Sequence, residues 1–152
     1  MLLFLAFLIG IIAGLRALTA PAAVAWGAAL GWFDVSQTPL AFMGYRWTPW
    51  IFTLLALVEL VTDQLPSTPS RKVPMQFGAR LIMGALSGAT IGAAGGSLIA
   101  ALAAGILGAV AGTLGGAAAR ARLAGAFQRD PPAAILEDAV AIVGAVLIVA
   151  SV

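Results

Sequence analysis

Five long apolar segments fill most of this sequence of 152 residues. About 20 apolar residues in a helix cross the hydrocarbon layer of a bilayer, and a helix satisfies its own backbone hydrogen bonds there. The composition agrees with this interpretation, since 62% of the residues are hydrophobic and only 9% are charged. The sequence therefore predicts an all-α fold, a polytopic transmembrane helix bundle that forms a single transmembrane domain over residues 1–152.

The first segment is too long for one straight span. Residues 2–33 as one helix would measure about 48 Å at about 1.5 Å per residue. Pro21 has no amide hydrogen to donate, so it interrupts the helix near its middle. We expect two half-helices or a strongly kinked span, which is not cleaved as a signal peptide because no basic region precedes it. The other segments cover residues 48–65, 77–94, 97–119 and 131–152, which gives about five spans with a broken first span.

Two connections between these segments are basic, and both are expected on the cytoplasmic side of a bacterial inner membrane because cytoplasmic loops are enriched in Lys and Arg. Five crossings then place the N-terminus inside and the C-terminus outside. A re-entrant first segment would change only the side of the N-terminus. The basic residues are Arg71, Lys72 and Arg80 in loop 66–80, and Arg120, Arg122 and Arg129 in loop 120–130.

Several functions are excluded by residue types that the chain lacks. It contains no His and no Cys, so it offers no thiolate, disulfide or imidazole ligand. Its formal net charge of +2 comes from eight basic residues spread over the loops, which does not indicate a nucleic-acid partner. Ser87, Asp63 and Asp138 lie outside the motifs of intramembrane proteases. We expect no cofactor, no metal and no enzymatic activity.

Glycine recurs every fourth residue along two segments. This spacing puts a smooth stripe on one face of each helix, where backbones can approach closely in lipid. We interpret the stripes as a glycine zipper for helix packing, and a glycine-lined pore is the alternative. Packing between subunits would make a homo-oligomer, with a dimer favoured because five helices of this length enclose little volume. The glycines are Gly84, Gly88, Gly92 and Gly96 in one segment, and Gly108, Gly112 and Gly116 in the next.

Arg16 lies near the midpoint of the first segment, where a charge costs roughly 2.5–3.5 kcal/mol unless it is paired or reaches water. Glu59 and Asp63 are four residues apart and share a helix face. Glu137 and Asp138 lie at a similar depth in the last segment. We predict that Arg16 and these four carboxylates form a polar cluster beside the break, which would bind a substrate or ion. The alternative is that the charges reach the membrane interface or form a structural ion pair.

Arg80 adds a second arginine in similar surroundings. Gly78-Ala79-Arg80 echoes Gly14-Leu15-Arg16, and each half of the chain ends with an acidic helix. Two related halves with inverted topology would place a binding site at broken helices, as in many transporters. Chance in a sequence rich in Ala and Gly explains so short a match equally well, so both explanations stay open. Arg80 joins the candidate substrate- or ion-binding residues.

The stretches GLRALTAP (14–21), VELVTDQLPSTPSR (58–71) and GALSG (84–88), with Arg80 between the last two, resemble the domain-of-unknown-function 4126 family of small bacterial membrane proteins. The resemblance covers most of the chain. Its most specific element is Glu-x-x-x-Asp-x-x-Pro at residues 59–66, together with the acidic pair at 137–138. The resemblance implies a fold, a membrane location and a recurring set of charged positions, rather than an activity.

Two functions remain for such a chain. The first is transport or permeation of a small solute or ion through a polar site at the broken helix. The alternative is a non-transporting membrane scaffold or lipid-interacting protein, in which the charge pairs only hold the helices together. The lipid bilayer is the expected partner in both cases, with a small solute or ion as a further partner in the first.

Overall fold

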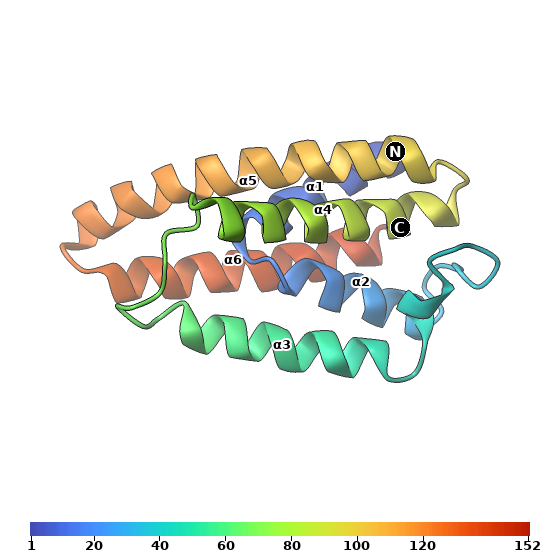
Figure 1. Ribbon diagram of the computed structural model, residues 1–152, viewed down its shortest axis with the longest axis horizontal. Helices are drawn as coiled ribbons and strands as arrows, with labels where there is room; N and C mark the ends of the chain where they lie inside the picture. The colour runs from blue at the N-terminus through green and yellow to red at the C-terminus, as the bar shows by residue number, and fades with distance from the viewer.

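Six α-helices and one 3-10 turn make up the chain in a computed structural model that describes residues 1–152 (Figure 1). No strand is present, so the predicted all-α class is confirmed. Helices α4, α5 and α6 are long and apolar enough to cross a membrane, and α1 and α3 are shorter apolar helices. The helices are α1 (Leu2–Leu15), α2 (Thr19–Ala29), α3 (Thr48–Thr62), α4 (Pro74–Ala94), α5 (Leu98–Phe127) and α6 (Asp130–Ala150), and the 3-10 turn η1 is Ala41–Gly44.

The first apolar segment is broken at Arg16, which ends α1 in an extended conformation with φ −138° and ψ 110°. Pro21 lies in the first turn of α2, where a backbone amide would have no partner within the helix. The prediction of two half-helices around this proline is therefore confirmed. Residues 16–18 connect the two half-helices: the amide of Arg16 still donates to the carbonyl oxygen of Ile12, and the carbonyl oxygen of Leu18 accepts from Ala22.

Helices α1 and α2 form a re-entrant pair rather than one bent span. In Figure 1, α1 starts beside the α4–α5 turn, and α2 leads back toward the same end of the bundle, where α6 also ends. A side chain at Gly95 would meet Leu2, and one at Gly27 would meet Val149, so both outer ends of the pair lie at that end. The expected five crossings, with the two termini at opposite ends, are therefore wrong. The N- and C-termini share one end, and the α3–α4 and α5–α6 connections share the other.

The α3–α4 and α5–α6 connections lie at one end of the bundle, which we call the loop end. Both connections are shorter than predicted. Helix α4 begins at Pro74, a residue suited to the first helical position, so Arg80 lies inside the helix. Helix α5 continues to Phe127, and Arg120 and Arg122 lie on it. Ala, Leu and Arg are strong helix formers, so charge alone does not end a helix. Gln128, with φ 56°, makes the turn into α6.

Helices α1, α4 and α5 pack directly against one another. Their backbones are in contact at glycine positions. A side chain at Gly84 or Gly88 of α4 would collide with the backbone of α5. One at Gly108 or Gly112 of α5 would collide with the backbone of α1. In lipid, no hydrophobic driving force brings helices together. Close backbone approach of this kind holds them through dispersion contacts instead. These three helices form the tightest part of the bundle.

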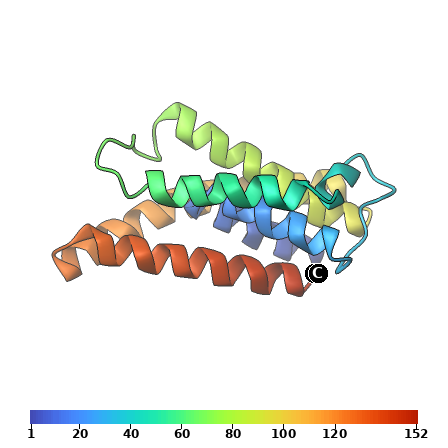
Figure 2. The ribbon, with the colours of Figure 1, turned by 90° about the horizontal axis from the view of Figure 1, so that it is seen from below.

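Helix α3 lies at the periphery and packs mainly on α2 (Figure 2). Most of its large apolar side chains are exposed, as suits a helix that faces lipid. Away from the loop end, Trp26 of α2 donates a hydrogen bond to Thr53 of α3 at 2.9 Å and packs edge-to-face on Trp50. Near the loop end, α3 is held by its acidic residues.

Candidate functional site

The guanidinium group of Arg16 is completely buried at the break and is surrounded by carboxylates from α6 and from the C-terminal end of α3. Its Nε donates a hydrogen bond of 2.6 Å to Oδ1 of Asp138, and its Nη1 donates to Asp63. Its Nη2 lies 4.0 Å from Oε2 of Glu137. The expensive charge predicted from the sequence therefore has two direct carboxylate partners and a third nearby.

Glu59 lies beside this arginine but binds the backbone. Its two carboxylate oxygens accept hydrogen bonds of 2.8 Å from the amides of Ala17 and Leu18, at the start of α2. Those amides have no partner within the helix, and the N-terminal end of a helix carries a partial positive charge. Glu59 thus caps α2 from another helix. The predicted pairing of Glu59 with Arg16 is replaced by this cap.

Arg80 of α4 caps the other helix end at the break, the C-terminal end of α1. Its Nη1 donates hydrogen bonds of 2.8 Å to the carbonyl oxygens of Gly14 and Leu15. The C-terminal end of a helix carries a partial negative charge, which a buried cation stabilises. Its Nη2 lies 3.9 Å from Asp63, so Arg80 and Arg16 share that carboxylate. Both ends of the broken helix are therefore capped by charges of the protein itself.

A second layer of ion pairs lies between the break and the loop end. Arg71 makes two hydrogen bonds to Glu137, of 2.5 and 2.9 Å. Arg120 makes two to Asp130, of 3.0 and 2.7 Å, and its Nη1 also lies 3.4 Å from Glu137. Together with the inner layer, these groups form one connected set of four guanidinium groups and four carboxylates, and Glu59 lies beside the set on the backbone amides of α2.

Three residues of this second layer are absent from the predicted site. The sequence indicates Arg71 and Arg120 only as markers of basic loops, and Asp130 is not among the predicted residues at all. A signal was present, since Arg120 and Asp130 lie at the two ends of the predicted loop 120–130, between antiparallel segments, and could meet there. The position of Arg71 over Glu137, in contrast, depends on the path of the loop that follows α3.

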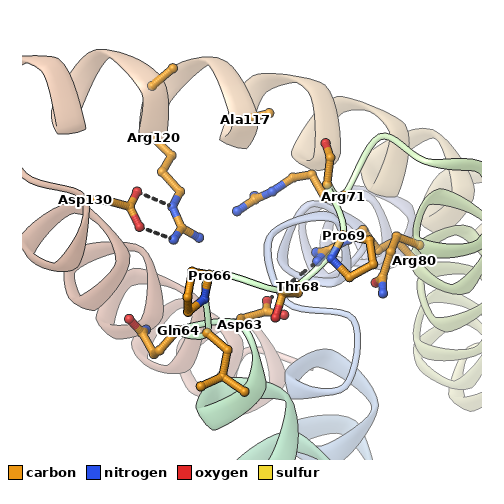
Figure 3. Close-up of a pocket in the computed structure, with 14 residues that line it drawn as sticks. Asp63, Gln64, Pro66, Thr68, Pro69, Arg71, Arg80, Ala117, Arg120 and Asp130 are labelled. Atoms are coloured by element: carbon orange, nitrogen blue, oxygen red, sulfur yellow. Dashed lines mark hydrogen bonds and ion pairs between the residues drawn. The ribbon is translucent and has the colours of Figure 1, made fainter.

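A polar cavity of about 470 Å³ opens at the loop end and reaches the inner layer (Figure 3). Arg71 and Arg120 point into it from opposite sides, and Asp130 pairs with Arg120 at one wall. Asp63 and Arg80 line it and also contact the break, so they connect the cavity to the buried charges. A polar molecule entering from the loop end would reach Asp63 and Arg80, the residues that contact the break, without crossing the apolar part of the bundle.

The candidate glycines occupy three different kinds of position. Gly84, Gly88 and Gly92 face α5, and Gly108 and Gly112 face α1. Gly96 lies in the α4–α5 turn with φ 71° and takes no part in helix contacts. Gly116 lies beneath the second layer, where a side chain would come within 3.2 Å of Nη1 of Arg71.

The family described as "Domain of unknown function (DUF4126)" matches residues 3–151, nearly the whole chain. No curated protein and no solved structure matches the chain.

Proposed function

The chain belongs to the DUF4126 family, whose description names no activity, and from the geometry of its site we propose that it carries a small solute or ion across the membrane. The observation that carries this proposal is a polar cavity at the loop end whose lining residues Asp63 and Arg80 contact a charged break in a re-entrant helix pair. Irregular backbone and buried charge at membrane depth are costly, and transporters place both where they line a substrate path.

Asp63 is the residue on which we centre the mechanism. It lines the cavity, and its carboxylate is shared by Arg16 and Arg80. A solute or proton that binds Asp63 competes with both arginines, and loss of those contacts weakens the attachment of α3 to the break. Binding at the cavity is thereby coupled to the packing of the helix pair, which is what alternating access requires.

The orientation and assembly of the protein belong to the same proposal. The basic residues gather at the loop end, so we place that end on the cytoplasmic side of a bacterial inner membrane. A homodimer would close the lipid-facing side of the bundle, where α3 packs mainly on α2 and η1. No residue of the cavity is assigned a catalytic role, and related inverted halves remain a prediction.

Flux through purified protein tests the proposal. The protein is reconstituted in liposomes, and uptake of protons, monovalent ions and small organic acids, amines and zwitterions is compared with that of empty liposomes. We expect uptake of at least one class, and its loss in the variant Asp63→Asn. Asp34→Asn is the matched control, because Asp34 is an exposed loop carboxylate that accepts a 2.8 Å backbone hydrogen bond away from the cavity. No uptake of any class by folded protein would contradict the proposal.

One observation favours the second candidate, a membrane scaffold or lipid-interacting protein. Each of the four carboxylates in the set has an arginine partner, and the two helix ends at the break are capped by Glu59 and Arg80 rather than left free for a substrate. A set that only holds helices together would leave flux absent, while Asp63→Asn would still lower stability. The two candidates therefore differ in the flux assay and agree in the stability assay.

A further inference from the structure

Arg120 stands between two cavities of opposite character. On one side lies the polar cavity at the loop end, which Arg120 lines together with Arg71 and Arg80. On the other side lies an apolar groove of about 190 Å³ between α5 and α6, which Arg120 also lines. The groove runs along α5 from Gly116 to Leu123 and along α6 from Ala133 to Val140. A single arginine side chain thus borders both spaces.

The two spaces together have the chemistry of an amphiphile. Three guanidinium groups meet in the polar cavity, and planar guanidinium groups bind the oxygens of phosphates and carboxylates in pairs. The carboxylate nearest to Arg80 is Asp63, which is 3.9 Å away and is bound more closely by Arg16. The polar cavity is lined by three arginines but by only two carboxylates, Asp63 and Asp130, and Arg80 shares the first of these with Arg16.

The groove suits an acyl chain. Six of its nine lining residues have apolar side chains, the others being Gly116, Arg120 and Glu137, and α5 and α6 are two of the helices that face lipid. Arg120 lies seven residues, or about 10 Å, from the end of α5, which is a depth at which a headgroup meets the first part of its chains. Arg122 and Arg129 add positive charge at the same end of the bundle, and this attracts anionic lipids.

We propose that the polar cavity takes the phosphate headgroup of an anionic membrane lipid, with an acyl chain lying in the groove between α5 and α6 and Arg120 bridging the two parts. The headgroup displaces Asp130 as a partner of Arg120. This displacement is feasible because the Asp130 side chain is 58% exposed, so water can solvate its carboxylate once the pair opens. The inference goes beyond the proposed function, because lipid binding is measured apart from solute flux, and a headgroup in the polar cavity would compete with a solute for that space.

Spin-labelled lipids test the proposal directly. The protein is reconstituted in phosphatidylcholine, and the immobilised fraction of chain-labelled phosphatidylglycerol is compared with that of chain-labelled phosphatidylcholine by electron paramagnetic resonance. We expect the association constant of phosphatidylglycerol to exceed that of phosphatidylcholine by about fivefold, the ratio expected for one arginine contact. In Arg120→Gln the ratio falls to about 1, whereas in Arg122→Gln, which changes an exposed arginine outside both cavities, most of the preference remains.

A second pair of variants tests the groove without changing any charge. Ala119 is exposed and lines the groove, and Ala118 is exposed and does not. Ala119→Trp should remove most of the specifically immobilised lipid, and Ala118→Trp should retain it. Equal immobilisation of the two lipids by the unaltered protein, or equal effects of the two tryptophans, would overturn the proposal. Binding of glycerol phosphate to the protein without any preference for phosphatidylglycerol would also overturn it, and would assign the cavity to a free anion.

Discussion

Glu59 and Arg80 carry opposite charges and cap the two helix ends at the break. Glu59 accepts hydrogen bonds from the free amides at the start of α2, and Arg80 donates hydrogen bonds to the free carbonyl oxygens at the end of α1. The break leaves backbone groups without helical partners at membrane depth, where water cannot satisfy them. Charged side chains from α3 and α4 supply those partners and are themselves stabilised by the helix dipoles. The break and the buried charges therefore depend on each other.

The cap by Glu59 predicts a graded loss of stability. Glu59→Gln keeps one acceptor oxygen and removes the charge, so it should lower the free energy of unfolding by about 1 kcal/mol, and Glu59→Ala by about 2 kcal/mol. The measurement is unfolding in mixed detergent micelles followed by circular dichroism. The control is Asp34→Asn. Hydrogen bonds from Ser36 hold the pKa of Asp34 below its ordinary value, yet Asp34 is in water, so no measurable change is expected. Equal effects at the two sites would contradict the capping role.

Arg16 is buried against Asp63 and Asp138, so substitutions of these residues should have strongly non-additive effects on the free energy of unfolding. Arg16→Gln leaves Asp63 and Asp138 without their closest cation and should cost about 3–5 kcal/mol. The double variant Arg16→Gln with Asp138→Asn should cost less than the sum of the two single variants, because one unpaired charge is removed. Arg129→Gln, in the α5–α6 connection, is the control with no expected loss. Additive effects would mean that Arg16 and Asp138 do not interact.

Two glycines of α5, Gly105 and Gly115, should differ in how their substitution changes stability, because only Gly105 is in close contact with another helix. A side chain at Gly105 would collide with the backbone of Gly84, so Gly105→Ala should separate α4 from α5 and destabilise the protein by about 2 kcal/mol. Gly115 has open space around its Cα, so Gly115→Ala should be neutral or should stabilise α5 by up to about 1 kcal/mol. Melting temperatures of the two variants check this. A similar change in both would contradict the close contact.

The re-entrant pair predicts where the chain ends. Because the chain has no cysteine, single cysteines can be placed without a background signal. Cysteines introduced at Met1 and at Val152 should react with a membrane-impermeant maleimide from the same side of the membrane. Cysteines at Thr68 and Gln128, at the loop end, should react from the other side. A first residue labelled together with Thr68 would contradict the re-entrant pair and support five crossings.

The sequence predicted the break and its neutralisation because both follow from local costs. Pro21 cannot continue a helix, and Arg16 cannot remain unpaired in lipid, so a break and a group of carboxylates were both expected. The direction of α2 after the break could not be predicted, since the length of segment 2–33 suits a kinked span as well as a re-entrant pair. The role of Glu59 depends on that direction, because only the observed turn aims the amides of Ala17 and Leu18 at α3.

The outer half of the site could not be predicted for a different reason. Arg71 and Arg120 have the composition expected of cytoplasmic loops, and only the extension of α5 to Phe127 and the path of the loop after α3 bring them over one cavity. The contacts of Gly116 illustrate the same point. Its spacing fits a helix-packing stripe, but its neighbours are Leu15, Arg71 and Glu137 rather than another glycine.

Transport requires the break to be a point on a path across the membrane. The accessibility of position 17 to a water-soluble reagent shows whether it is. Ala17 lies at the break next to Arg16 and is nearly buried, so Ala17→Cys adds a small thiol where a solute would pass. The reaction rate with a charged, membrane-impermeant thiosulfonate is measured in vesicles with the reagent on one side and then on the other. The transport account predicts reaction from both sides, because alternating access exposes the site to each in turn. Reaction from the loop end alone, or from neither side, would contradict transport and leave the charges with a structural role.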